Sequence, residues 1–153
     1  MKWLWAFLNL TFPRTGDHHA AKGIVAYRAG DHADAIGPLK KALGRKLRKF
    51  ARDEVATILG NAHCELNQFE AAVKAHLQAL KANRRSHSVW VNLGVANRLL
   101  NRLDEAERCY SQALMLKPDY AEAHSSLGAL HVIRKRPEQA IVSLNHAERL
   151  DGS

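Results

Sequence analysis

The sequence contains little of what a disulfide-stapled or membrane-spanning protein requires. Only two of its 153 residues are cysteines, Cys64 and Cys109, and neither lies in a pairing motif or a metal-type spacing. A disulfide framework is therefore not indicated, and a reducing compartment is expected. The apolar stretch from Trp3 to Phe12 is too short to cross a bilayer as a helix, and no small-residue cleavage pattern precedes Pro13.

Motifs of catalytic sites are missing as well. The sequence has no glycine-rich phosphate loop, no nucleophile elbow and no pair of carboxylates at the spacing of a hydrolase site. We therefore expect that the protein is not an enzyme, that it has no catalytic residues and that it needs no cofactor.

Charge is present but unevenly distributed. The formal net charge is +8, and residues 1–52 hold 11 Lys and Arg against three Asp, whereas the remainder of the chain is balanced. The excess therefore lies in the first third. A hydrophobic content of 46% fits a soluble globular protein, so one compact body is expected.

Small residues recur along the chain at a fixed step. Three ladders share spacings of 37, 34 and 34 residues: Gly23, Gly60, Gly94 and Gly128; Ala35, Ala72, Ala106 and Ala140; Ala42, Ala79, Ala113 and Ala147. Each glycine lies inside a predicted helix, where it costs about 1 kcal/mol relative to alanine. Something must approach closely enough to need the space, and the shared spacing predicts that it is another copy of the same unit.

The pattern resembles the tetratricopeptide repeat, whose unit is a 34-residue helix-turn-helix. The segment from His87 to Tyr120 matches best, through Trp90, Leu93, Gly94, Leu100, Ala106, Tyr110, Ala113, Leu114 and Pro118. It departs at Asn97, where the family pattern usually has tyrosine. The first unit matches least well, because Lys22 replaces the leucine before Gly23. The resemblance specifies a fold but no particular function.

The resemblance implies an all-α, right-handed α-solenoid of four tetratricopeptide-like repeats and eight helices. The repeats are expected at about 16–49, 53–86, 87–120 and 121–153, after an N-terminal apolar segment over 1–15. Their turns are predicted at Ala29-Gly30-Asp31, Leu66-Asn67-Gln68, Leu100-Asn101-Arg102 and Lys135-Arg136-Pro137. Glu148 stands where Leu43, Leu80 and Leu114 stand in the other repeats, so we expect no further repeat to stack on the fourth.

The nine histidines do not form a predicted metal site. His19 and His124 occupy the site that Trp90 fills in the third repeat, and His63 is equivalent to His131 two repeats away. Residues two repeats apart do not converge on one metal ion. They are therefore interpreted as packing and surface residues.

By resemblance, the first helix of each repeat lines a concave groove that binds a peptide or helix of a partner. The predicted groove residues are Tyr27, Arg28, Thr57, Asn61, Cys64, Glu65, Val91, Asn92, Val95, Arg98, Leu99, Ser125, Ala129 and Val132. The carboxylate clamp of chaperone-type members is not predicted, because Thr57, Glu122 and Ser126 stand at its cation positions. The asparagine ladder of sugar-transferase relatives is absent too. An ordinary solvated surface remains the alternative for any single residue.

The segment LKKALGRKLRKFARDE (residues 39–54) carries the basic excess. Because Leu39, Leu43, Leu47 and Phe50 fall on one stripe, we expect the second helix of the first repeat to continue for about one extra turn, with Gly37-Pro38 kinking or loosening its start. The predicted basic patch comprises Lys40, Lys41, Arg45, Lys46, Arg48, Lys49 and Arg52. It is either a solvated face or a site for an acidic protein or an anionic membrane surface. Nucleic acid ranks last, because few aromatic residues lie beside it.

The N-terminal segment MKWLWAFLNLTFP is apolar all round a helix, so it requires burial. Three alternatives stay open: packing over the start of the first repeat or in a partner's interface, insertion at a membrane surface through Trp3 and Trp5, and processing.

The sequence therefore predicts a non-enzymatic scaffold that binds a protein or peptide ligand in the groove. The alternatives are a peripheral membrane adaptor and a regulatory module of a partner enzyme. A cytoplasmic location, peripheral to a membrane in the second case, is expected, and the sequence does not determine the oligomeric state.

Overall fold

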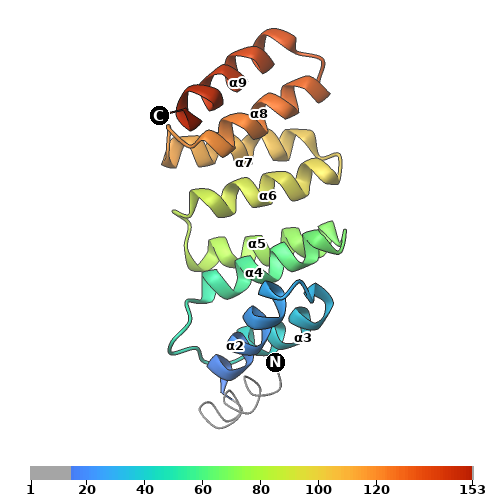
Figure 1. Cartoon of the computed structure of the whole chain (residues 1–153), viewed down its shortest axis with the longest axis vertical. Helices are drawn as coiled ribbons and strands as arrows, with labels where there is room; N and C mark the ends of the chain where they lie inside the picture. The colour runs from blue at the N-terminus through green and yellow to red at the C-terminus, as the bar shows by residue number, and fades with distance from the viewer. Residues whose placement is uncertain (1–14, 153) are drawn as a thin grey trace. The chain divides into compact units, whose positions relative to one another are not determined.

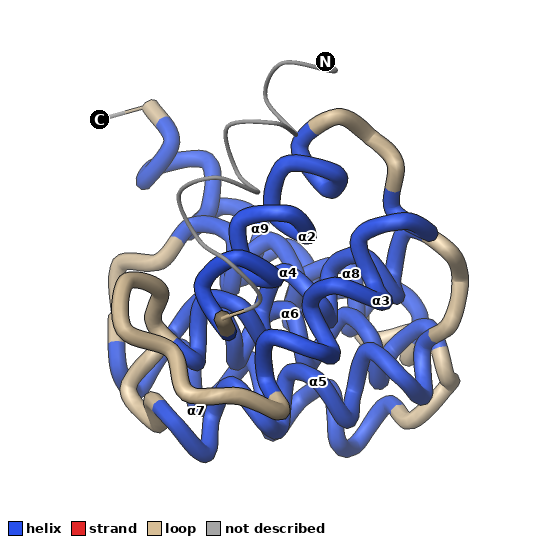
Figure 2. Tube along the Cα trace, turned by 90° about the horizontal axis from the view of Figure 1, so that it is seen from below, coloured by secondary structure: helices blue, strands red, loops and turns tan. Residues whose placement is uncertain are grey.

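The computed structural model describes residues 15–152, which form helices joined by turns and loops. Figure 2 shows no strand in this part of the chain. Contacts divide the molecule into two compact units, Met1–Asn83 and Arg84–Ser153, named here the N-terminal unit and the C-terminal unit. The predictions for residues 1–14 lie outside the described residues.

The N-terminal unit consists of two helix-turn-helix pairs (Figure 1). Its described helices are α2 (Gly16–Arg28), α3 (His32–Leu43), α4 (Arg52–Glu65) and α5 (Phe69–Ala82). Within the unit, α2 packs on α3, α3 on α4 and α4 on α5, while α2 also touches α4. The Thr15 hydroxyl caps α2 by accepting the backbone N–H of His18 at 3.2 Å.

The C-terminal unit repeats this plan. Its described helices are α6 (His87–Leu99), α7 (Leu103–Leu116), α8 (Ala121–Ile133) and α9 (Pro137–Asp151). Helix α7 packs on α6 and on α8, α8 packs on α9, and α6 also touches α8. Pro137 begins α9, where its missing N–H leaves no helical hydrogen bond unmade. The prediction of eight repeat helices is confirmed.

Each pair turns at one residue with positive φ. These residues are Gly30 (85°), Asn67 (56°), Asn101 (59°) and Lys135 (55°). Glycine and asparagine tolerate this left-handed conformation, whereas lysine is strained there. The fourth turn spans Arg134 to Arg136, one residue earlier than predicted, because Pro137 already belongs to the helix.

The glycine ladder faces the second helix of its own pair, not another repeat. A Cβ on Gly94 would lie 2.7 Å from Cδ1 of Tyr110, and one on Gly60 would lie 2.6 Å from Nδ1 of His76. The prediction that these glycines touch copies of the unit is therefore wrong at the glycines. The space they leave is filled by a large side chain from the partner helix, in the pairs Gly23/Leu39, Gly60/His76, Gly94/Tyr110 and Gly128/Leu144.

The predicted extension of the second helix is also wrong. Helix α3 runs through Pro38 but ends at Leu43, and residues 44–51 form a loop that holds Leu47 and Phe50. The first repeat spacing is 37 residues and the later ones are 34, and this loop accommodates the three additional residues. Gly44 takes the position after the last helical residue, and the Arg52 guanidinium donates to the carbonyl oxygens of Leu43 and Arg45, which caps the helix end.

Asp17 holds the same loop from the other side. Its Oδ1 accepts the backbone N–H groups of Arg48 at 2.9 Å and Lys49 at 3.0 Å. Burial acts to raise the pKa of this carboxyl, but the N–H groups of Lys49, Arg48 and Phe50 more than offset it and hold the pKa below its ordinary value. Arg45, Lys46, Arg48 and Lys49 are therefore exposed on a loop anchored at both ends, not along a helix.

Candidate protein-interaction surface

The predicted groove residues of the N-terminal unit lie near the ends of α2 and α4. Arg28 and Glu65 are exposed, while Tyr27, Asn61 and Cys64 are half-buried. Because α2 and α4 touch, these side chains belong to neighbouring helices. Burial and then the charge of Glu65 raise the pKa of the Cys64 thiol, so it stays protonated near neutral pH. This surface is small and mostly polar.

The corresponding surface of the C-terminal unit is more apolar. We call it the α6/α8 surface and define it by Asn92, Val95, Arg98, Leu99, Ser126, Ala129, Val132 and Ile133. Leu99 is 45% exposed on α6, while Val132 is 60% and Ile133 47% exposed on α8. Val91 is fully buried and forms part of the core, so its assignment to the groove is wrong. Exposed aliphatic side chains on two touching helices are the feature expected of a protein-binding face.

A buried hydroxyl lies beneath this surface. The Tyr110 side chain on α7 is fully buried, and its hydroxyl has no hydrogen-bond partner among the described residues. Burial raises the pKa of this hydroxyl; Arg98 and Ser126, which lie beside it, act in the opposite direction without completing a hydrogen bond. An unpaired buried hydroxyl costs about 1 to 3 kcal/mol.

Sequence reasoning missed two members of the α6/α8 surface, Ile133 and Ser126, and the buried Tyr110 hydroxyl beneath it. Ile133 is equivalent to Leu99 one repeat later, so the spacing alone identifies it. Ser126 and Tyr110 had been assigned to the absent clamp and to the repeat pattern, respectively. Only the structure brings the Tyr110 hydroxyl close to Arg98 and Ser126.

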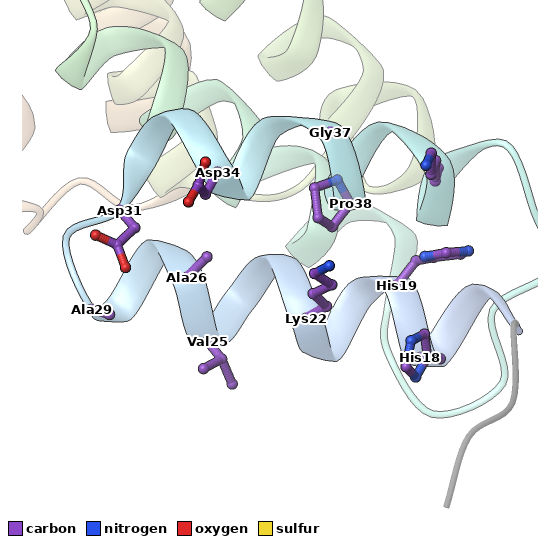
Figure 3. A pocket seen from close by; sticks show the side chains of 11 residues that line it. His18, His19, Lys22, Val25, Ala26, Ala29, Asp31, Asp34, Gly37 and Pro38 are labelled. Carbon is purple, nitrogen blue, oxygen red and sulfur yellow. The ribbon is translucent and has the colours of Figure 1, made fainter. Parts of the chain in front are cut away.

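Clefts lie among the described helices of both units. The first cleft, of about 440 Å³, lies between α2 and α3 and has His18, His19 and Lys22 at one end and Asp31 and Asp34 at the other (Figure 3). The second cleft, of about 360 Å³, is bounded by α3, α4 and α5 and includes Lys40, His63 and Lys74. The third cleft, of about 450 Å³, is bounded by α7, α8 and α9 and includes Glu107, His131 and Glu138.

The histidines serve in packing at several of these sites. His63 Nδ1 bonds Gln68 Oε1 at 2.7 Å, whereas neither ring nitrogen of the fully buried His76 has a partner among the described residues. Burial lowers the pKa of His76 to about 4, so its ring is neutral at pH 7. Within residues 15–152, no three His, Cys, Asp or Glu side chains are grouped to hold a metal ion. None of the described helices has the length and apolar character needed to cross a membrane.

Family models of the tetratricopeptide repeat match residues 55–88 and 87–120. Residues 55–120 therefore match tetratricopeptide repeats, as the sequence pattern predicted. The predicted fold class, an all-α helical-repeat solenoid, is confirmed as well. Repeats of this kind are protein-interaction modules and are in general not catalytic.

Curated relatives and solved structures agree with this assignment. The chain is 26% identical over 113 residues to the mouse Superkiller complex protein 3, and 26% identical over 112 residues to the human one. The aligned part is 73% of this chain but only 7% of the length of either relative. A crystal structure of MamA is 21% identical with a TM-score of 0.85, covering 97% of this chain and 85% of that one. MamA residues 41-end from Desulfovibrio magneticus RS-1 are 17% identical with a TM-score of 0.83, covering 94% and 79%. At these identities the structural likeness concerns the fold alone.

Proposed function

We propose that this chain is a non-enzymatic scaffold that binds a helix or extended segment of a partner protein on the α6/α8 surface. The observation that carries the proposal is the exposure of Leu99 and Val132, at 45% and 60%, on touching helices around Arg98. Aliphatic side chains bury apolar area at about 25 cal/mol per Å², and the Arg98 guanidinium, on the same helix as Leu99, favours an acidic or carbonyl-bearing partner.

The polar side chains of the α6/α8 surface would orient the bound segment. Arg98 and Ser126 lie beside the buried Tyr110 hydroxyl and are themselves half-buried, so an acceptor of the partner would meet up to two donors. Asn92, on the same first helix, adds an amide that can bond an extended backbone.

Affinity capture with matched variants tests the proposal. Leu99→Glu and Val132→Glu place a charge on the proposed surface without disturbing the core, because both side chains already face solvent. Met115→Glu is the control, since Met115 is 77% exposed on α7 and lies outside that surface. A partner identified by mass spectrometry should bind the parent and the control with the same Kd, and the two surface variants at least about tenfold more weakly. Equal binding of all four proteins would refute it.

The anchored basic loop supports a second candidate, a peripheral membrane adaptor. Asp17 and Arg52 fix the loop that presents Lys46, Arg48 and Lys49 to solvent. Fixed cations attract an anionic surface at about 1 kcal/mol per residue at low salt. Replacing all three by glutamine should reduce sedimentation with phosphatidylserine vesicles. The same substitution at Lys74, Lys81 and Arg84, which are exposed elsewhere, should have less effect. A cytoplasmic location is part of both proposals.

A further inference from the structure

The second cleft is a recess with an excess of positive charge. It is bounded by α3, α4 and α5 of the N-terminal unit, and its volume is about 360 Å³. Lys40 lines it from α3 and Lys74 from α5, whereas the described residues around it include no aspartate or glutamate. Neither ammonium group forms an ion pair with a carboxylate of residues 15–152. The two charges are therefore available to a ligand.

A buried imidazole lines the same cleft. His63 on α4 is 3% exposed, and its Nδ1 bonds Gln68 Oε1 at 2.7 Å. A carbonyl oxygen only accepts hydrogen bonds, so Nδ1 carries the hydrogen and a further proton would go to Nε2. Burial lowers the pKa of His63, the bond to Gln68 acts against that shift, and the charge of Lys40 lowers the pKa further. The ring therefore senses the charge in the cleft, and a bound anion would favour its protonated form.

This excess of positive charge is not a requirement of the repeat. A shift of two 34-residue repeats carries the second cleft onto the third, and it relates the lining residues Leu43/Ser111, Leu59/Leu127, His63/His131, Ala71/Gln139, Lys74/Val142 and Ala75/Ser143. The histidine is thus shared, but Val142 replaces Lys74, and the third cleft contains Glu107 and Glu138. The two clefts have the same place in the repeat and select ligands of opposite charge.

We infer that the second cleft binds a phosphate group between Lys40 and Lys74, carried on a phosphorylated serine or threonine of a protein partner. A phosphate dianion matches two ammonium groups in charge and offers acceptor oxygens to both. Leu43, Leu59 and Ala75 also line the cleft and would contact the carbon atoms of the phosphorylated side chain. A recess bounded by three helices suits a projecting side chain better than the surface of a bilayer. The inference is independent of the α6/α8 surface and of the basic loop.

Titration of the full chain with phosphoserine tests this assignment through the imidazole NMR signals of His63. These signals are assigned among the nine histidines by their absence in His63→Gln. Phosphoserine should shift them saturably, whereas serine at matched ionic strength should not. Inorganic phosphate should bind more weakly than phosphoserine, because it lacks the carbon atoms that contact the apolar lining. Lys40→Gln and Lys74→Gln should each raise the Kd for phosphoserine at least about threefold.

Lys81→Gln is the matched control, because it removes the same charge from an exposed position of α5 that does not line the cleft. It should leave the Kd within experimental error of the parent. An equal loss of affinity in Lys81→Gln and Lys74→Gln would overturn the inference, as would the absence of a saturable His63 shift. Equal affinity for inorganic phosphate and phosphoserine would overturn the assignment to a phosphorylated side chain. A His63 signal that responds to phosphatidylserine vesicles but not to phosphoserine would assign the lysines to a membrane surface and also overturn it.

Discussion

The second and third repeats solve the same packing problem with different chemistry. In the N-terminal unit, His76 fills the space over Gly60; in the C-terminal unit, Tyr110 fills the space over Gly94, and both side chains are fully buried. The imidazole carries two nitrogens without a partner among the described residues, whereas the phenol carries one hydroxyl that lies beside Arg98 and Ser126. The side chain over the ladder glycine must therefore be large enough to fill the space. A polar atom in that side chain either destabilises the fold or serves another purpose.

The largest expected difference between the two repeats is a loss of stability of the second repeat at acidic pH. The pKa of His76 is about 4 in the folded chain and about 6.5 when unfolded, so the unfolded state binds more protons between these values. The stabilisation by the neutral ring is complete above pH 6.5 and is lost as the pH falls toward 4. We expect a loss of about 2 kcal/mol between pH 7 and pH 4.5, measured by amide hydrogen exchange in α4 and α5.

His76→Leu is the matched variant for this experiment, because Leu39 fills the equivalent place in the first repeat. It should raise protection at pH 7 and remove most of the pH dependence of α4 and α5. His19 and His63 in the same unit also have lowered pKa values, each mainly through burial, so a residual slope of the same sign should remain. An unchanged slope in His76→Leu would show that His76 does not carry the acid sensitivity.

A methyl group added at the ladder glycine should destabilise the third repeat more than the fourth. In Gly94→Ala the new Cβ meets the rigid, fully buried ring of Tyr110, and we expect a destabilisation of about 2 kcal/mol from overpacking. In Gly128→Ala it meets Leu144, which is 43% exposed and free to rotate. The gain in helix propensity then offsets the strain, and the change should stay within about 1 kcal/mol. Urea unfolding compares the two variants, and a larger effect for Gly128→Ala would contradict this account.

The sequence predicted the repeats because small residues recur at a fixed spacing, and residue size follows directly from residue type. It identified the helices and the turns that contain Gly30, Asn67 and Asn101. It failed at residues 44–51, where the apolar spacing predicted a helix but Asp17 and Arg52 stabilise a loop through hydrogen bonds to its backbone. The Asp17 contacts join residues more than thirty positions apart, and a hydrogen bond between a side chain and a backbone group leaves no local pattern. The proximity of the Tyr110 hydroxyl to Arg98 and Ser126 escaped prediction because these residues also lie on different helices.

Removal of the Tyr110 hydroxyl oxygen should affect partner binding more than the stability of the third repeat. Tyr110→Phe keeps the ring over Gly94 and deletes a hydroxyl that has no partner among the described residues, so stability should change by less than about 1 kcal/mol. Because the buried hydroxyl lies beside Arg98, its removal should loosen that guanidinium and raise the Kd for the partner about threefold, which calorimetry with the partner identified by affinity capture measures. His76→Leu serves as the control outside the α6/α8 surface. A variant that binds as tightly as the parent would remove the hydroxyl from the proposed site.

The smallest effect concerns the turns, where the fourth repeat differs from the others. Lys135 has a φ of 55°, a conformation that Gly30, Asn67 and Asn101 adopt with less strain in the equivalent turns. Lys135→Asn should therefore stabilise the C-terminal unit by about 0.5 kcal/mol, whereas Lys135→Ala removes the same charge without relieving the backbone and should not. Conversely, Asn101→Lys should destabilise the third repeat by a similar amount. Urea unfolding of the three variants checks the sign, and a gain in stability from Lys135→Ala equal to that from Lys135→Asn would mean that charge, not backbone strain, distinguishes this turn.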